Sequence, residues 1–306
     1  MKVAVILSTY NGERFLREQL DSIINQTGVE VDLFVRDDGS ADGTKDILTE
    51  YAQKNGNIHL DFAENVGVGN SFMNALYSVP DTYDYYAFAD QDDIWQNDKL
   101  YNAAVMIEES NAYLYASNQE CTDKDMNSLG LRYSDDDKIN LLPFEIMQNN
   151  MLAGCTMVMS KEFVGILKDE NRRPTPHILR LRMHDVWVAF VAALYGKLVY
   201  DKRSFIKYRQ HESNVVGAKS KGKLYNLKTR INKLFNKQLR NGRSSLAALA
   251  VKCFPDIIDK HPEIADCADG HTFGGKKKIL NHSREIRKIS HEKSFTLFLK
   301  IIFGMY

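Results

Sequence analysis

Hydrophobic and polar positions follow two different periods in the first 110 residues of the chain. Continuous apolar runs rich in β-branched residues are typical of strands that are covered on both faces. Apolar residues that recur at spacings of three and four predict amphipathic helices. The pattern predicts strands at 2–7, 31–36, 58–62 and 85–89, and helices at 15–24, 44–55, 65–77 and 98–107. This alternation predicts an α/β fold with a mostly parallel sheet flanked by helices.

The remainder of the chain is less regular. Residues 110–145 predict short strands and loops, and 151–159 form a small-residue apolar segment. Residues 182–195 predict a helix that starts at His184 and Asp185, and 198–208 predict one or two late strands. After Gly217 no strand pattern occurs. We therefore expect a domain over 1–216, with two halves at 1–110 and 111–216, and a helical region over 217–306.

The charge is balanced overall but unevenly placed. The 306 residues are 44% hydrophobic and 26% charged, which is typical of a globular protein. Lys+Arg and Asp+Glu both number 40, yet 19 basic and 7 acidic residues fall from Gly217 onward. This region is either a solvated helical face or a surface for an anionic partner such as a membrane. It lacks interleaved aromatic residues, so no nucleic-acid partner is expected.

Cysteines and apolar runs bear on the cellular compartment. The four cysteines are widely spaced and form no C-x-x-C pair, which argues against a zinc site or a disulfide scaffold and fits a reducing compartment. They are Cys121, Cys155, Cys253 and Cys267. The apolar start is shorter than a signal sequence, and no apolar run reaches about 18 residues, so no membrane span is expected. The expected location is cytoplasmic, with peripheral membrane contact as an alternative.

Three polar clusters directly follow predicted strands, at 8–11, 37–38 and 90–93. Carboxyl ends of parallel strands meet at one edge of a sheet, where ligands of such folds bind. The last cluster, Asp-Gln-Asp-Asp, places three carboxylates in four residues, which repel one another unless solvated or neutralised by a cation. Oxygen ligands of this kind suit Mg²⁺ or Mn²⁺. The alternative is a polar turn that caps the next helix.

Other candidates each have a functional and a structural interpretation. Asp38 could accept a hydrogen bond from a nucleotide base or cap a helix. Asp185 could be a general base or a helix cap. His211 could ligate a metal, and Arg209 could neutralise phosphate. Neither a dinucleotide fingerprint nor a Walker A sequence occurs, since the G-x-G at 67–69 does not follow the first strand.

Taken in order, seven segments resemble glycosyltransferase family 2, an inverting family with the GT-A fold. They are VAVILSTYNGERFLREQLDSI, VRDDGSADGT, ENVGVGNSFMNAL, YYAFADQDDIW, NMLAGCTMVMS, MHDVWVAFVA and YRQHESNVVG. The D-Q-D-D-I-W form and the R-Q-H-x-S-N-V-V-G ending are most similar to rhamnosyltransferases of bacterial surface polysaccharides. The resemblance covers residues 1–217 and leaves the basic C-terminal region outside it.

The resemblance implies a role for each matching residue. Asp92 would coordinate Mn²⁺ or Mg²⁺, His211 would complete the metal site or hold the diphosphate, and Asp185 would be the catalytic base. The implied donor-side residues are Ser8, Tyr10, Asn11, Asp38, Asn65, Asp90 and Arg209, with Tyr10 on the base ring, Asp38 on the base N–H and Asp90 on the ribose. Those implied on the acceptor side are Gly154, Cys155 and His184.

These roles imply a reaction and its partners. The half at 1–110 would bind a UDP- or dTDP-sugar, and the half at 111–216 a glycan or lipid-linked glycan acceptor. One metal on the leaving diphosphate and one base suffice for a single displacement with inversion, whereas retention would require a second carboxylate. Two alternatives remain: a sugar nucleotidyltransferase, whose Gly-rich loop with Arg and Lys is missing at 8–14, and a binding module without turnover.

Overall fold

The structure is a computed structural model that describes residues 1–211 and 241–306. These residues form two compact units. The first unit contains residues 1–138, 152–170 and those from 197 to 211. The second unit contains residues 139–151, 171–196 and the described residues after 240. The expected boundary between 216 and 217 lies outside the described residues.

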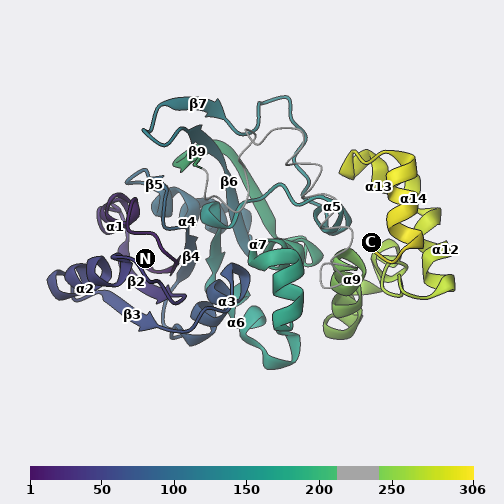
Figure 1. Cartoon of the computed structure of the whole chain (residues 1–306), viewed down its shortest axis with the longest axis horizontal. Coiled ribbons are helices and arrows are strands. Elements are labelled where there is room, and N and C mark those ends of the chain that lie inside the picture. Colours follow the sequence, from purple (N-terminus) through teal and green to yellow (C-terminus); the bar gives the residue numbers. More distant parts are fainter. Residues whose placement is uncertain (212–240) are drawn as a thin grey trace. The chain divides into compact units, whose positions relative to one another are not determined.

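A mixed sheet organises the first unit (Figure 1). Its strand order within the described residues is β3-β2-β1-β4-β8-β6-β9-β5, with β7 paired to β6. The strands β3, β2, β1 and β4 are parallel neighbours, while β8 runs antiparallel to both β4 and β6. The bounds are β1 Lys2–Thr9, β2 Glu30–Asp37, β3 Ile58–Phe62, β4 Tyr85–Ala89, β5 Ile94–Trp95, β6 Leu114–Thr122, β7 Ser128–Leu131, β8 Val158–Ser160 and β9 Leu198–Arg209.

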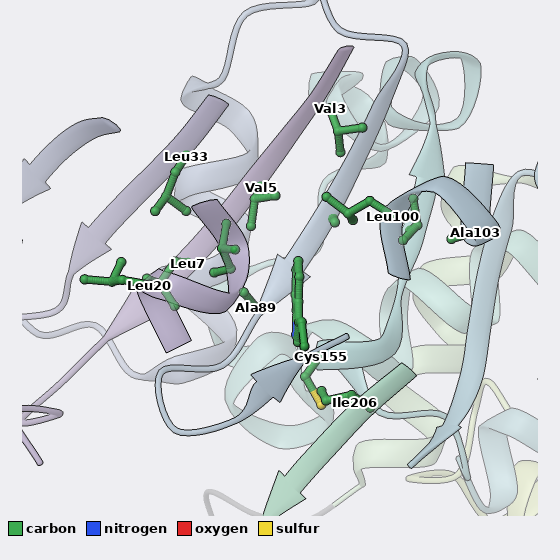
Figure 2. Close-up of a cluster of buried hydrophobic side chains, with 14 of the residues drawn as sticks. Val3, Val5, Leu7, Leu20, Leu33, Ala89, Leu100, Ala103, Cys155 and Ile206 are labelled. Carbon is green, nitrogen blue, oxygen red and sulfur yellow. The ribbon is translucent and has the colours of Figure 1, made fainter. Parts of the chain in front are cut away.

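Helices cover both faces of the parallel strands. One face packs against α1, α2 and α4, and this cluster includes Val5, Leu20, Leu33, Leu100 and Cys155 (Figure 2). The opposite face packs against α3, where the rings of Phe72 and Phe88 lie 5.2 Å apart. The helices of this unit are α1 Leu16–Ile24, α2 Thr44–Lys54, α3 Val68–Ser78, α4 Lys99–Ser110 and α6 Lys161–Lys168, and a 3₁₀ turn spans Gly154–Thr156. Coverage on both faces explains why β1 and β4 are continuously apolar.

The regular elements of the second unit are all helices within its described residues. Its helices are α5 Pro143–Gln148, α7 Pro176–Leu194, α9 Gly242–Cys253, α10 Pro255–Ile258, α11 Pro262–Ala265, α12 Phe273–Asn281, α13 Ser283–Ser290 and α14 Ser294–Ile302. The buried Tyr306 is tied to α5, because its hydroxyl donates to Gln148 Oε1 at 2.9 Å. Among the described residues, no helix has the length and apolar character needed to cross a bilayer.

The predicted alternation of strands and helices is confirmed, and the expectations at 58–62 and 85–89 match the strand bounds. The largest difference is α7, which begins at Pro176 rather than near Arg182. Its N-cap is Thr175, whose side chain accepts from the Ile178 N–H. The expected start at His184 corresponds instead to a break inside the helix, where Met183 has φ 60° and ψ 167°.

Candidate active site

The carboxyl ends of β1, β2 and β4 bring the three predicted polar clusters to one edge of the sheet. The parallel register pairs Thr9 with Asp37 and Leu7 with Ala89. The Thr9 hydroxyl donates to Asp37 Oδ2 at 2.9 Å, and the Asp38 N–H donates to the Thr9 carbonyl at 2.8 Å. The first two clusters are therefore directly hydrogen-bonded to each other.

The first loop is also tied to the acidic loop after β4. The Tyr10 N–H donates to Gln91 Oε1 at 2.8 Å, and Gln91 Nε2 donates back to the Tyr10 carbonyl at 3.1 Å. A Cβ on Gly12 would lie 2.3 Å from Gln91 Oε1, so glycine permits this close approach. The clamp leaves the Tyr10 ring 51% exposed, which suits a ring that stacks on a ligand.

The polar side chains beneath this loop are engaged by the protein. Ser8 Oγ lies 2.6 Å from Ser71 Oγ, so these two hydroxyls hydrogen-bond to each other. The Asn11 N–H donates to Ser40 Oγ at 2.9 Å, and Asn11 Oδ1 accepts from the Ala41 N–H at 2.9 Å. Ser8 and Asn11 thus stabilise the edge, and their predicted contacts with a donor remain predictions.

Asp38 organises the loop after β3. Its carboxylate accepts from the backbone N–H groups of Val66 and Gly67, each at 3.0 Å, and pairs with the Arg36 guanidinium. Asp38 is 2% exposed, whereas the neighbouring Asn65 is exposed. The carboxylate therefore holds the Asn65 loop in place, and its predicted contact with a nucleotide base is untested.

Asp92 and His211, 119 residues apart in sequence, meet at this edge. His211 Nε2 lies 2.8 Å from Asp92 Oδ2, and both side chains are mostly buried but reach solvent. The His211 ring also packs 5.0 Å from the ring of Phe15. A carboxylate oxygen and an imidazole nitrogen are both ligands that Mn²⁺ accepts, so this pair fits the predicted metal-binding role.

Arg209, at the end of β9, holds the acidic loop at 90–93 in place through hydrogen bonds. Its backbone N–H donates to Asp93 Oδ1 at 3.2 Å, and its Nε donates to the Asp92 carbonyl at 3.0 Å. Two further donors reach the Lys124 carbonyl at 2.9 Å and Glu18 Oε2 at 2.7 Å. The guanidinium is thus held by protein acceptors, which makes Arg209 a positioning residue; its predicted role on phosphate is untested.

A second group of possible ligand atoms lies deeper. Single ligand atoms of Asp90, Asp93 and Cys155 fall within 4.8 Å of one another, so this group could hold a metal ion. Asp93 Oδ2 is buried and has no hydrogen-bond partner in the described part of the chain. Burial raises the pKa of both Asp93 and Cys155 well above their usual values. A protonated thiol is a poor ligand, so these three residues fit a hard divalent cation less well than Asp92 and His211.

Lys99 belongs to the same interior and was not expected from the sequence. It is fully buried at the start of α4, with its Nζ 3.7 Å from the centroid of the Trp95 ring. Burial lowers the pKa of Lys99 to about 7, so the low-polarity interior favours the neutral amine. A lysine in a helical pattern normally predicts a solvated position, and no local signal distinguishes this one.

Asp185 lies in the second unit, two residues after the break at Met183. The Met183 conformation, φ 60° and ψ 167°, is one that residues other than glycine rarely adopt. Asp185 Oδ1 accepts from the Val186 N–H at 2.7 Å, and Asn150 Nδ2 lies 3.5 Å from Asp185 Oδ2. The break therefore presents the carboxylate at the start of a new helical segment, and its contact with Asn150 is one that the sequence did not reveal.

The acceptor-side predictions fall at buried positions. Gly154 and Cys155 form part of the buried 3₁₀ turn in the first unit, and His184 is 3% exposed in the second. Their predicted contacts with an acceptor remain untested.

His184 has a measurable consequence for stability. Burial lowers the pKa of His184 to about 3, against about 6.5 in an unfolded chain. Between these two pKa values only the unfolded chain binds this proton. The free energy of unfolding therefore decreases as the pH is lowered below about 6.5. When the pH is lowered from about 7 to about 5, the free energy of unfolding should decrease by about 2 kcal/mol less in His184→Gln than in the wild type. Urea unfolding at both pH values measures this, and His271→Gln, at an exposed position, should behave as wild type. Equal losses in His184→Gln and wild type would contradict it.

Comparisons with known proteins bear on this arrangement. The family model described as glycosyl transferase family 2 matches residues 4–169. The dTDP-rhamnosyl transferase RfbG of Shigella flexneri is 31% identical over 259 residues, which is 79% of this chain and 84% of that protein. TuaG of Bacillus subtilis (strain 168), a glycosyltransferase named for teichuronic acid biosynthesis, is 30% identical over 180 residues, or 56% of this chain and 67% of that one.

A solved structure has the same architecture. S. aureus TarS 1-349 in complex with UDP-GlcNAc matches with a TM-score of 0.57 at 20% sequence identity. The match covers 100% of this chain and 93% of that chain. At this level of identity the likeness concerns the fold, which is shared.

Proposed function

This chain belongs to glycosyl transferase family 2, and from that premise we propose that it is a metal-dependent, inverting enzyme that transfers one sugar from a UDP- or dTDP-sugar to a glycan or lipid-linked glycan. The family establishes that the chain is a glycosyltransferase with a GT-A fold, as the sequence predicted. The sugar nucleotidyltransferase and the non-catalytic module are therefore set aside. The metal, the donor and the acceptor constitute the proposal.

The meeting of Asp92 and His211 at 2.8 Å on the carboxyl edge of the sheet carries the proposal. These two side chains would hold Mn²⁺ or Mg²⁺, both of which accept oxygen ligands. The metal, when bound, supplies Lewis-acid stabilisation of the charge that develops on the leaving diphosphate. Arg209 supports this role because it anchors the Asp92 carbonyl and Asp93.

On the donor side, the exposed Tyr10 ring stacks on the nucleotide base, and Asp38 accepts a hydrogen bond from the base N–H. Asp90 hydrogen-bonds the ribose, and Asn65 lies within the same donor pocket. The similarity to the dTDP-rhamnosyl transferase favours dTDP-rhamnose as the first donor to test. Both uracil and thymine carry the N–H that Asp38 would accept, so a UDP-sugar is the second.

Asp185 is the proposed general base. Its carboxylate takes the proton from the acceptor hydroxyl as that oxygen attacks the anomeric carbon, and the diphosphate leaves from the opposite face. The bond to the acceptor oxygen forms as the bond to the diphosphate oxygen breaks, which inverts the anomeric configuration. Asn150 keeps the carboxylate in place, and His184, Gly154 and Cys155 belong to the acceptor side.

A thermal-shift screen tests the donor and the metal together. With a saturating correct donor and Mn²⁺, we expect stabilisation of about 3 kcal/mol at a hundredfold excess over Kd, or roughly 5–10 °C in Tm. UDP-, dTDP- and GDP-sugars are compared with and without Mn²⁺, and chelation by EDTA should reverse the shift. If no nucleotide sugar produced a Mn²⁺-dependent shift, the proposed donor and metal site would be wrong.

The proposed biological role is the synthesis of bacterial surface polysaccharide at the cytoplasmic face of the membrane. The relative named for teichuronic acid biosynthesis supports this role. A lipid-linked acceptor would require at least peripheral contact with the bilayer. Part of the basic region expected to make that contact, residues 217–240, lies outside the described residues.

A further inference from the structure

Helix α14 exposes an apolar face opposite the one that it buries. Leu297 and Ile301 point into the second unit and are almost fully buried. Phe295, Phe298 and Ile302, at spacings of three and four, share the outward face of the helix and are exposed, Phe295 to 72%. A helix that is apolar on both faces normally lies in a protein core or in contact with lipid.

The neighbouring helix α12 and the residue after α14 extend this surface. The two helices pack against each other (Figure 1), and Lys276 Nζ donates to the Ile302 carbonyl at 2.8 Å. Phe273 lies one turn before Lys276 on α12 and is 88% exposed, and Phe303 is 62% exposed. We call the five exposed side chains the aromatic surface: Phe273, Phe295, Phe298, Ile302 and Phe303.

The segment that carries the aromatic surface is rich in basic residues. Residues 273–303 contain eight Lys or Arg residues and two Glu residues. Lys300 pairs with Glu292 at 3.0 Å and Lys278 with Asp266 at 3.4 Å. By contrast, Lys277 and Arg287 form no ion pair within the described residues and are exposed. This segment is therefore net positive, and the charges of Lys277 and Arg287 are not paired within the described residues.

Exposed phenylalanine and uncompensated lysine together select one kind of partner. Aromatic side chains enter the boundary between headgroups and acyl chains, while flanking lysines and arginines bind anionic headgroups. A second copy of the chain would bring two like-charged surfaces together, which disfavours self-association. The nine residues of α14 are too few to span a bilayer, so the contact must lie in the plane of the interface.

We infer that the aromatic surface of α12 and α14 docks the protein onto an anionic lipid bilayer. Phe295 and Phe298 insert at the interface, and the lysines and arginines of α12 and α13 bind the headgroups. This inference deepens the proposed function and rests on it, because a lipid-linked acceptor presents its glycan at such a bilayer. The docking itself depends only on the second unit.

Vesicle co-sedimentation of the full chain tests the inference. Wild type should bind phosphatidylcholine vesicles that contain phosphatidylglycerol, and bind pure phosphatidylcholine vesicles weakly. Phe295→Ser with Phe298→Ser should lower the partition coefficient by roughly tenfold or more, and Lys277→Glu with Arg287→Glu by a similar factor that shrinks at high salt. Leu129→Ser with Leu131→Ser is the matched control, since these residues of β7 in the first unit are 60% and 54% exposed.

Two measurements keep the outcomes distinct. The Phe variant should retain the wild-type donor thermal shift, since its altered residues are exposed and belong to no proposed catalytic group. Unchanged vesicle binding by the Phe variant, or no binding by wild type, overturns the docking inference. So does a concentration-dependent dimer that the Phe variant abolishes, because it would assign the surface to a second copy. If the wild type bound vesicles but showed no thermal shift with any donor, only the proposed function would be overturned.

Discussion

Replacing Asp185 by asparagine is expected to lower kcat by roughly 10²- to 10⁴-fold, the usual contribution of a general base. Asparagine keeps the shape of the side chain and can still accept from the Val186 N–H, the contact that Asp185 Oδ1 makes at 2.7 Å. It cannot take a proton from an acceptor hydroxyl. Steady-state transfer assays with saturating donor measure kcat, and the donor thermal shift measures binding separately.

The matched control for this variant is Asp256→Asn, an exposed aspartate in the first turn of α10 in the same unit. It should transfer sugar at the wild-type rate. A second comparison, Asn150→Ala, should lower kcat by less than Asp185→Asn because it only loosens the carboxylate. If Asp185→Asn transferred sugar within threefold of wild type, the base would have to be another residue. If the variant lost both transfer and donor binding, the role of Asp185 would be structural.

Replacing Asp92 by asparagine should abolish the Mn²⁺-dependent part of donor binding and lower kcat/KM by roughly 100-fold or more. The reason is that a metal on the diphosphate supplies several kcal/mol of charge stabilisation, and each 1.4 kcal/mol is tenfold in rate. His211→Gln should have the same kind of effect, since its Nε2 lies 2.8 Å from Asp92 Oδ2. The double variant should be little worse than either single one.

Mn²⁺ titration in the presence of the nucleoside diphosphate discriminates the two possible metal positions. Cys155→Ala changes the deeper group with Asp90 and Asp93 while leaving Asp92 and His211 in place. If Asp92 and His211 hold the metal, the apparent Mn²⁺ affinity should be unchanged in Cys155→Ala and at least tenfold weaker in Asp92→Asn. The reverse order would move the metal to the deeper group.

Much of the first unit could be predicted because its signals are local. The strand at 85–89 is an apolar run, and the strand at 58–62 alternates apolar and polar residues. Parallel strands place their carboxyl ends at one edge of the sheet whatever their side chains are. This geometry correctly brought the loops at 8–11, 37–38 and 90–93 together. The meeting of these three loops at one edge of the sheet could therefore be predicted from the periodicity alone.

The pairing of side chains at that edge was not readable in the same way. One of the donors of Arg209 binds Glu18, which is 191 residues away in the sequence, and no local pattern indicates this contact. The break at Met183 also left no local signal, because methionine is a good helix former and only tertiary packing can hold it at φ 60°. Lys99 is buried because α4 packs against β6, β8 and β9, which lie later in the sequence.

The position of Arg209 and His211 at the end of β9 has a consequence for synthesis on the ribosome. The strands β1 to β4 emerge within the first 89 residues and can pair as soon as they are free of the exit tunnel. The acidic loop stays without its anchor until about 120 further residues have been made. Until then Asp90, Asp92 and Asp93 repel one another on an open edge. Among the described strands, β9 is the last to be synthesised, and it is the strand that anchors the acidic loop of the proposed donor site.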